Sequence, residues 1–168
     1  EDTWNAGEAD VVMMLLRQIV ESDEFMGFME EDLKPQVPPI GIICMYSKQR
    51  SLIDKLKAEA PWLGTARRLV KVDTVDSYQG KENRIVILST VRNNSHGGIG
   101  FLRSPNRVNV ALSRAMERLF IVGASKLWQG KNQDFPLGRV LRHTRKLEAE
   151  GRASVVSAAD LGEIGRAS

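Results

Sequence analysis

The chain has 168 residues, of which 42% are hydrophobic and 27% charged, and its formal net charge is +3. This size fits one domain of common length with a short tail, and the composition excludes the disordered, fibrous and membrane-spanning classes. No apolar run reaches the ~18 residues of a membrane helix, and the acidic start Glu1-Asp2 is unlike a signal peptide. The single cysteine, Cys44, lies in an apolar run, which favours a buried, reduced thiol and a cytosolic or nuclear location.

Charge is unevenly distributed along the chain. Residues 1–40 hold ten acidic and two basic side chains, whereas residues 103–152 hold eleven basic and four acidic ones. Clustered Lys and Arg attract phosphate backbones, although solvated helix faces would give the same pattern. Charge alone leaves both interpretations open.

The amino-terminal third of the chain predicts a helix and then a loop. A helix is expected from Asn5 to Glu21, because Asn5 and Glu8 form a capping box ahead of apolar residues on one face. A loop is expected over 23–39, because three prolines near its end bar a regular helix. The acidic residues among 23–32 favour an exposed insertion.

Four apolar runs predict a sheet. Residues 40–46 and the Ile85–Leu88 run within 84–91 are continuously apolar except for Gly41, as in strands covered on both faces. The complete set of expected strands is 40–46, 69–74, 84–91 and 119–123, and the expected helices between them are 47–59 and 105–116. Alternating strands and helices indicate an α/β layered domain with a mostly parallel sheet, whose functional loops gather at the carboxyl ends of the strands.

The pattern weakens after Trp128. Four apolar residues still share one face of a predicted basic helix, namely Leu137, Val140, Leu141 and Leu147. Residues 151–168 contain few apolar side chains, which predicts a loosely ordered tail.

Three segments stand in the order expected of one family. Val72–Glu82 followed by Val86–Arg92 resembles motif V of superfamily 1 helicases, and Asn109–Ala115 resembles motif VI. Ile42–Arg50 is similar to motif IV, and Ile99–Leu102 resembles a signature of the superfamily 1B branch, which contains the RNA-surveillance helicases. The resemblance covers about residues 5–128 and implies a RecA-like three-layer domain.

By this resemblance, residues 1–128 form the second RecA-like motor domain of a helicase and residues 129–168 form an extension. The family resemblance assigns Gln79, Gly80 and Glu82 to the nucleotide. It also makes Arg114 the arginine finger that meets the γ-phosphate, and finger arginines typically accelerate phosphoryl transfer ~10³–10⁵-fold. A helix over 105–116 would point Arg107 and Arg114 in the same direction.

The resemblance assigns a second set of residues to single-stranded nucleic acid. Ser47, Thr74 and Asp76 are short polar residues expected at strand ends, where hydroxyls and backbone amides contact phosphates. Taken singly, such residues are more often helix or turn caps. Arg92 either contacts a phosphate or braces the glycine-rich loop that follows, and the sequence does not separate these uses.

A phosphate-binding loop of the form G-x-x-x-x-G-K-[ST] is absent from the sequence. ATP with Mg²⁺ is therefore expected to be held mainly by the first RecA-like domain of a longer chain, and the 168 residues alone are expected to be inactive. His96 and His143 have no partners at metal-ligand spacing, so no metal site is predicted.

Two functions remain in competition. The first is a helicase or translocase motor half that binds single-stranded nucleic acid, with RNA favoured over DNA on family grounds. The second is an inactive docking module that uses the acidic 23–32 segment. A stand-alone P-loop kinase or GTPase is excluded, because the sequence has no phosphate loop.

Overall fold

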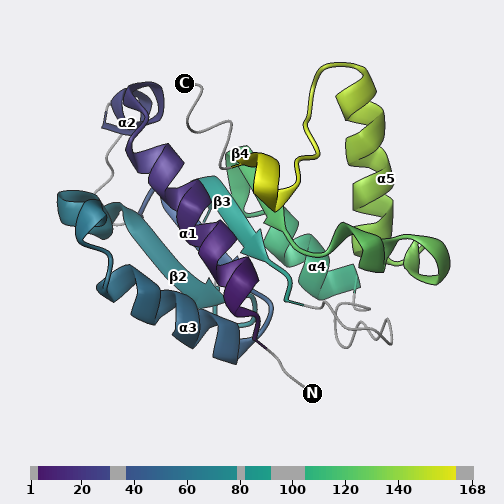
Figure 1. Cartoon of the computed structure of the whole chain (residues 1–168), viewed down its shortest axis with the longest axis horizontal. Helices are drawn as coiled ribbons and strands as arrows, with labels where there is room; N and C mark the ends of the chain where they lie inside the picture. Colours follow the sequence, from purple (N-terminus) through teal and green to yellow (C-terminus); the bar gives the residue numbers. More distant parts are fainter. Residues whose placement is uncertain (1–3, 31–36, 79–81, 92–104, 162–168) are drawn as a thin grey trace. The chain divides into compact units, whose positions relative to one another are not determined.

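The computed structural model describes residues 4–30, 37–78, 82–91 and 105–161 (Figure 1). Its α-helices are α1 (Ala6–Val20), α2 (Asp23–Glu30), α3 (Ser47–Ala58), α4 (Pro105–Leu112) and α5 (Pro136–Ala149). Its strands are β1 (Ile40–Cys44), β2 (Val70–Thr74), β3 (Asn83–Ser89) and β4 (Ala115–Val122). It also contains the 3₁₀ segments η1 (Pro61–Leu69), η3 (Ser125–Trp128) and η4 (Gly130–Asn132). None of the helices in these ranges has the length and apolarity required to cross a membrane.

The chain divides into two compact units. The first unit comprises residues 1–91 and 109–123 and contains the sheet, and the second comprises residues 92–108 and 124–168.

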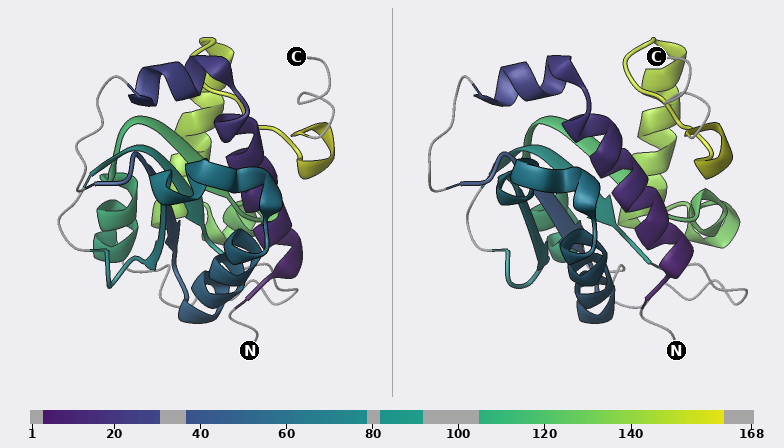
Figure 2. Two further views of the ribbon diagram at one scale, coloured as in Figure 1. Left: turned by 90° about the vertical axis from the view of Figure 1, so that its left-hand side faces the viewer. Right: turned by 60° about the vertical axis from the view of Figure 1, so that its left-hand side comes forward.

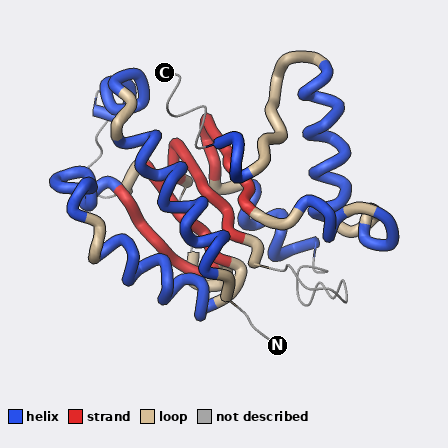
Figure 3. Tube along the Cα trace, in the orientation of Figure 1, coloured by secondary structure: helices blue, strands red, loops and turns tan. Residues whose placement is uncertain are grey.

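The four strands form one sheet (Figure 3) in the order β2-β1-β3-β4. Every hydrogen-bonded pair of strands is parallel. Helices α1 and α3 cover one face of this sheet, and the part of α4 that belongs to the first unit lies on the opposite side (Figure 2). Both faces of the two central strands are buried, since Ile42, Ile43, Ile87 and Leu88 have no exposed surface. The prediction of an α/β, RecA-like domain with a parallel sheet is therefore confirmed, and its continuously apolar central strands reflect burial on both faces.

The predicted first helix is also confirmed, but its capping differs from the prediction. Asn5 Oδ1 accepts the backbone N–H of Glu8 at 2.9 Å, as an N-cap residue should. The reciprocal half of the capping box is replaced by tertiary bonds, because the Asn5 N–H donates to Gln49 Oε1 and the Glu8 carboxylate points toward β3. Glu8 therefore has a partner far away in the sequence.

The loop predicted over 23–39 was wrong for its first part, which forms α2. Ser22 begins this helix by accepting the N–H of Phe25 through its hydroxyl, and Asp23 and Glu24 lie in the first turn. Negative charge is favourable there because it faces the positive end of the helix dipole. The prolines that argued against a helix all follow Glu30 in the sequence, so they do not prevent α2.

The boundary between α4 and β4 also differs from the prediction. Helix α4 ends at Leu112 and β4 begins at Ala115, four residues earlier than the predicted strand. The strand begins early because Ala115 pairs with Asn83 in the first position of β3. Arg114 therefore lies in the turn after α4, and the argument that its helix orients it together with Arg107 is wrong.

Gly41 in β1 permits a close approach of two side chains. A Cβ at this position would lie 2.6 Å from Asn83 Oδ1 and would also meet the Tyr78 hydroxyl. We expect Gly41→Ala to lower the free energy of unfolding by about 1–3 kcal/mol, as overpacking does in a filled core. Urea unfolding monitored by circular dichroism would measure the loss.

Gly27→Ala is the matched control, because nothing lies within 4 Å of a Cβ added at Gly27 on α2. Alanine is the better helix former, so this variant should be as stable as the parent protein or slightly more stable. Equal stability of the two glycine variants would contradict the packing described for Gly41.

The second unit contains η3, η4 and α5. The predicted basic helix is confirmed as α5, and its Leu137 is buried together with Leu127 and Trp128 of η3. Asn132 donates through Nδ2 to the Leu127 carbonyl oxygen at 2.9 Å. This small apolar cluster, closed by a buried hydrogen bond, holds the start of α5.

Candidate functional site

The amino-terminal edge of the sheet brings together two of the predicted nucleotide residues. Asn83 and Ala115 are partners in the parallel ladder, so the residues that precede them, Glu82 and Arg114, lie on neighbouring chain segments. The Asn83 N–H donates to the Arg114 carbonyl oxygen at 2.9 Å. Gln79 and Gly80 lie outside the described residues.

Asn83 is the centre of a buried cluster at the same edge. Its Oδ1 accepts the hydroxyl of Tyr78, and its Nδ2 donates to the Pro38 carbonyl oxygen at 2.6 Å. Asn83 is 1% exposed and Tyr78 is 3% exposed. The cluster therefore joins Tyr78 and Asn83 to each other, to the backbone of Pro38 and, through the Asn83 N–H, to the backbone of Arg114.

The Arg114 side chain is half-buried at this edge. Its Nε donates to the Val110 carbonyl oxygen at 3.2 Å. Burial raises the pKa of Tyr78 to about 12, and the hydrogen bond that Tyr78 donates to Asn83 and the positive charge of Arg114 act in the opposite direction. The positive charge of Arg114 therefore acts on Tyr78.

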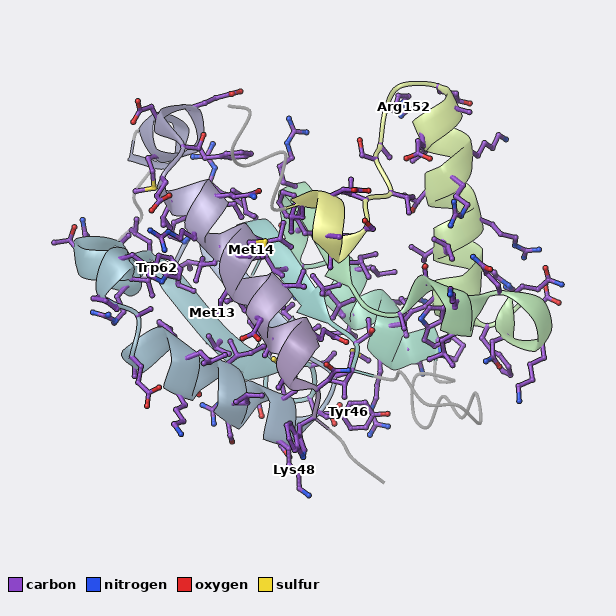
Figure 4. The ribbon with its side chains drawn as sticks, in the orientation of Figure 1. Met13, Met14, Tyr46, Lys48, Trp62 and Arg152 are labelled. Carbon is purple, nitrogen blue, oxygen red and sulfur yellow. The ribbon has the colours of Figure 1, made fainter. Side chains whose placement is uncertain are left out.

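Three of the predicted nucleic-acid residues, Ser47, Thr74 and Asp76, lie at the opposite, carboxyl-terminal edge. Thr74 ends β2 and pairs with Cys44, which ends β1, and exposed Ser47 follows at the start of α3. Figure 4 shows Tyr46 and Lys48, the neighbours of Ser47, beside this helix start.

Thr74 has a local role, because its Oγ1 accepts the N–H of Ser77 and so closes the turn that contains exposed Asp76. This bond is the turn-cap role that single polar residues often have. The Thr74 hydroxyl that makes it lies at the carboxyl-terminal edge of the sheet. Arg92 lies outside the described residues.

A buried polar network underlies this edge. Glu8 Oε1 accepts the Ser89 hydroxyl at 2.7 Å and the Val91 N–H at 2.8 Å. Gln49, which is fully buried, donates from Nε2 to Ser89 Oγ and to the Asn5 carbonyl oxygen. Val91 has a φ of 73°, an unfavourable conformation for a β-branched residue, and the Glu8 carboxylate stabilises its N–H.

Glu8→Ala should lower the free energy of unfolding by about 1–3 kcal/mol, because it leaves the buried Val91 N–H and Ser89 hydroxyl without their acceptor. Glu8→Gln keeps an acceptor oxygen and should be nearly as stable as the parent protein at neutral pH. Urea midpoints of the two variants measure the difference, and equal losses in both would contradict the role of this acceptor.

The same carboxyl group predicts a pH dependence. Burial is the main cause that raises the pKa of Glu8, against the hydrogen bonds from Ser89 and Val91. The folded state therefore binds the proton more tightly than the unfolded state, and this contribution to stability declines as the pH rises from the ordinary carboxyl value through the raised one. Glu8→Gln should flatten that decline when unfolding is measured from pH 4 to 7.

Functional loops were expected at the carboxyl ends of the strands. Ser47 and Thr74 lie there, whereas Glu82 and Arg114 lie at the amino ends of β3 and β4. The sequence interpretation also missed Asn83 and the bonding roles of Gln49 and Glu8. Gln49 gave one usable signal, since it lies one helical turn before fully buried Ile53 and so shares its face.

Cys44 is buried, as predicted, and burial raises the pKa of its thiol. A neutral thiol packed in β1 has a structural role. The described ranges contain no cluster of three or more His, Cys, Asp or Glu side chains able to hold a metal ion.

A parallel RecA-like sheet, with segments that resemble motifs V and VI meeting at one edge, is the arrangement expected of a superfamily 1 helicase domain. The chain belongs to the AAA domain family, whose model matches residues 1–126, and it is a superfamily 1 helicase-family domain.

Comparison with known proteins gives relatives of the same kind. The chain is 48% identical over 93 residues to the "Helicase required for RNAi-mediated heterochromatin assembly 1" of Schizosaccharomyces pombe, and the match covers 54% of the chain and 9% of that protein. It is 43% identical over 110 residues to the "Regulator of nonsense transcripts 1 homolog" of Arabidopsis thaliana, with 58% and 8% covered. It is 36% identical over 101 residues to the "ATP-dependent helicase upf1" of S. pombe, with 60% and 11% covered. The chain thus spans about a tenth of the length of these relatives.

Proposed function

We propose that the chain is the second motor domain of an ATP-dependent helicase or translocase of single-stranded nucleic acid. One observation carries this proposal: the backbone of Arg114 is hydrogen-bonded to the Asn83 N–H, directly after Glu82, at one edge of the sheet, while Ser47 and Thr74 lie at the other. One rigid sheet would join a nucleotide site at one end of its β-strands to a nucleic-acid site at the other end. Such an arrangement is suited to couple nucleotide hydrolysis to movement along a nucleic-acid strand.

At the amino edge, Glu82 and Arg114 would face the outer side of a triphosphate. ATP with Mg²⁺ would supply the phosphoryl group, and its main cradle would come from a first motor domain. Arg114 would approach the phosphate oxygens when the two domains close and stabilise the charge that develops on them. Gln79, Gly80 and Glu82 would contact the nucleotide from the adjoining loop, with the Glu82 carboxylate accepting hydrogen bonds from ribose or water.

At the carboxyl edge, Ser47, Thr74, Asp76 and Arg92 would bind consecutive phosphates of one strand. Segment 75–82 runs from this edge to the amino edge, because β2 and β3 are parallel and the chain must return between them. It is therefore the shortest covalent link between the two sites. Relatives named as regulators of nonsense transcripts favour RNA as the strand, and the buried Cys44 thiol favours an intracellular, reducing location.

The test joins the chain to the first motor domain of its full-length protein and measures ATP hydrolysis with and without single-stranded RNA. We expect RNA-stimulated hydrolysis by the joined protein and none by the 168-residue chain. A joined protein that binds ATP and remains inactive with RNA would refute the motor assignment and favour a docking module.

A further inference from the structure

Helix α5 presents a basic face that the proposed motor sites do not use. Residues at i, i+3, i+4 and i+7 lie on one side of a helix, and at these positions α5 carries Arg139, Arg142, His143 and Lys146. All four are exposed. The opposite side carries buried Leu137 and half-buried Val140, Leu141, Thr144 and Leu147.

The charge on this face is only weakly neutralised. The described residues of the second unit from 124 to 161 include seven Lys or Arg and four Asp or Glu. Asp134 pairs with Arg142 at 3.2 Å, but both side chains are more than half exposed, and such surface pairs contribute little. Glu148 Oε2 accepts the Val155 N–H, and Glu150 pairs with Arg152 beyond the helix.

We infer that this basic face of α5 is a second binding site for the phosphate backbone of single-stranded nucleic acid. Seven helical residues separate Arg139 from Lys146, which corresponds to about 10 Å along the helix axis. A stacked strand places one phosphate about every 3.4 Å, so the face spans about three phosphates. Arginine can bind a phosphate through two parallel N–H groups, and two of the four residues are arginines.

Two other kinds of partner fit this helix less well. A protein interface requires an apolar or aromatic centre, and the exposed face of α5 has none. A membrane-surface helix inserts its apolar side into lipid, but the apolar side of α5 packs within its own unit through buried Leu137. Phosphate contacts are the one class of recognition that needs only positive charge at regular spacing.

The test measures binding of the 168-residue chain to a fluorescent oligouridylate over a range of salt concentrations. Arg139→Gln combined with Lys146→Gln should reduce the slope of log affinity against log salt by about 1.4, since each lost phosphate contact on a single strand contributes about 0.7. Affinity should fall on the order of tenfold at 0.1 M salt. Glutamine retains helix propensity, so circular dichroism should show an unchanged fold.

Lys55→Gln combined with Arg68→Gln is the control, because it removes the same charge from exposed positions of the first unit. It should leave the slope unchanged. Equal slope changes in both double variants, or no change in either, would overturn the inference. The inference would also be overturned if polyglutamate bound as tightly as the oligouridylate and lost the same affinity in the α5 double variant.

This inference rests on the proposed function, and the two fail in different ways. If the α5 variant binds the oligouridylate like the parent, and the joined protein hydrolyses ATP in response to RNA, only the second site is refuted. If the α5 variant loses affinity for the oligouridylate, and the joined protein shows no RNA-stimulated hydrolysis, only the motor assignment is refuted.

Discussion

Arg114→Ala in the joined two-domain protein should lower RNA-stimulated ATP turnover by about 10³-fold or more, because a finger arginine typically contributes ~10³–10⁵ to phosphoryl transfer. RNA affinity should change little, since Ser47 and Thr74 lie at the other end of the strands. Steady-state turnover and fluorescence anisotropy, measured on the same preparation, separate the two effects.

Arg118→Ala is the matched control for this experiment. Arg118 is an exposed arginine on β4, four residues after Arg114, so its removal changes the net charge equally without touching the edge. We expect turnover close to that of the parent protein. Comparable losses in both arginine variants would show that general charge, and not the position of Arg114, supports hydrolysis.

Asn83→Ala should have the largest effect on stability among the polar residues of the site, about 2–4 kcal/mol. It removes the acceptor of the Tyr78 hydroxyl and the donor to the Pro38 carbonyl oxygen, both in a buried cluster, and each unsatisfied buried group costs about 1–3 kcal/mol. Urea unfolding monitored by circular dichroism measures the loss.

Tyr78→Phe is the companion variant, because it removes one hydroxyl and keeps the bond from Asn83 to Pro38. Its loss should be smaller, about 1 kcal/mol, the usual net value of one hydrogen bond. A loss as large as that of Asn83→Ala would assign the stability of the cluster to tyrosine packing and would contradict the central role given to Asn83.

The elements of the fold that local patterns determine were predictable. The run of apolar residues at Ile85–Leu88 specified a central strand, and the Asn5 cap specified the start of α1. Helix α2 was missed because prolines beyond its end were given more weight than the Ser22 cap and the acidic first turn. The early start of β4 depends on the pairing of Ala115 with Asn83, which is a tertiary contact.

The difference between local patterns and tertiary contacts also explains which features of the site were predictable. Motif resemblance proposes Ser47, Thr74, Glu82 and Arg114, and the sheet topology divides them between its two edges. Neither the division nor the supporting bonds can be read from the sequence, because the bond from Ser89 to Glu8 joins residues 81 positions apart. Single polar residues such as Asn83 carry no local signal of a distant partner.

The central claim is that the nucleotide and the single-stranded nucleic acid bind at opposite ends of the same four β-strands. Photocrosslinking of an azido-ATP to the joined protein in the presence of RNA, followed by peptide mapping, tests this claim most directly. We predict label on the first motor domain and, within this chain, on peptides that contain Glu82 or Arg114. Label concentrated on peptides that contain Ser47 or Thr74 would contradict the claim.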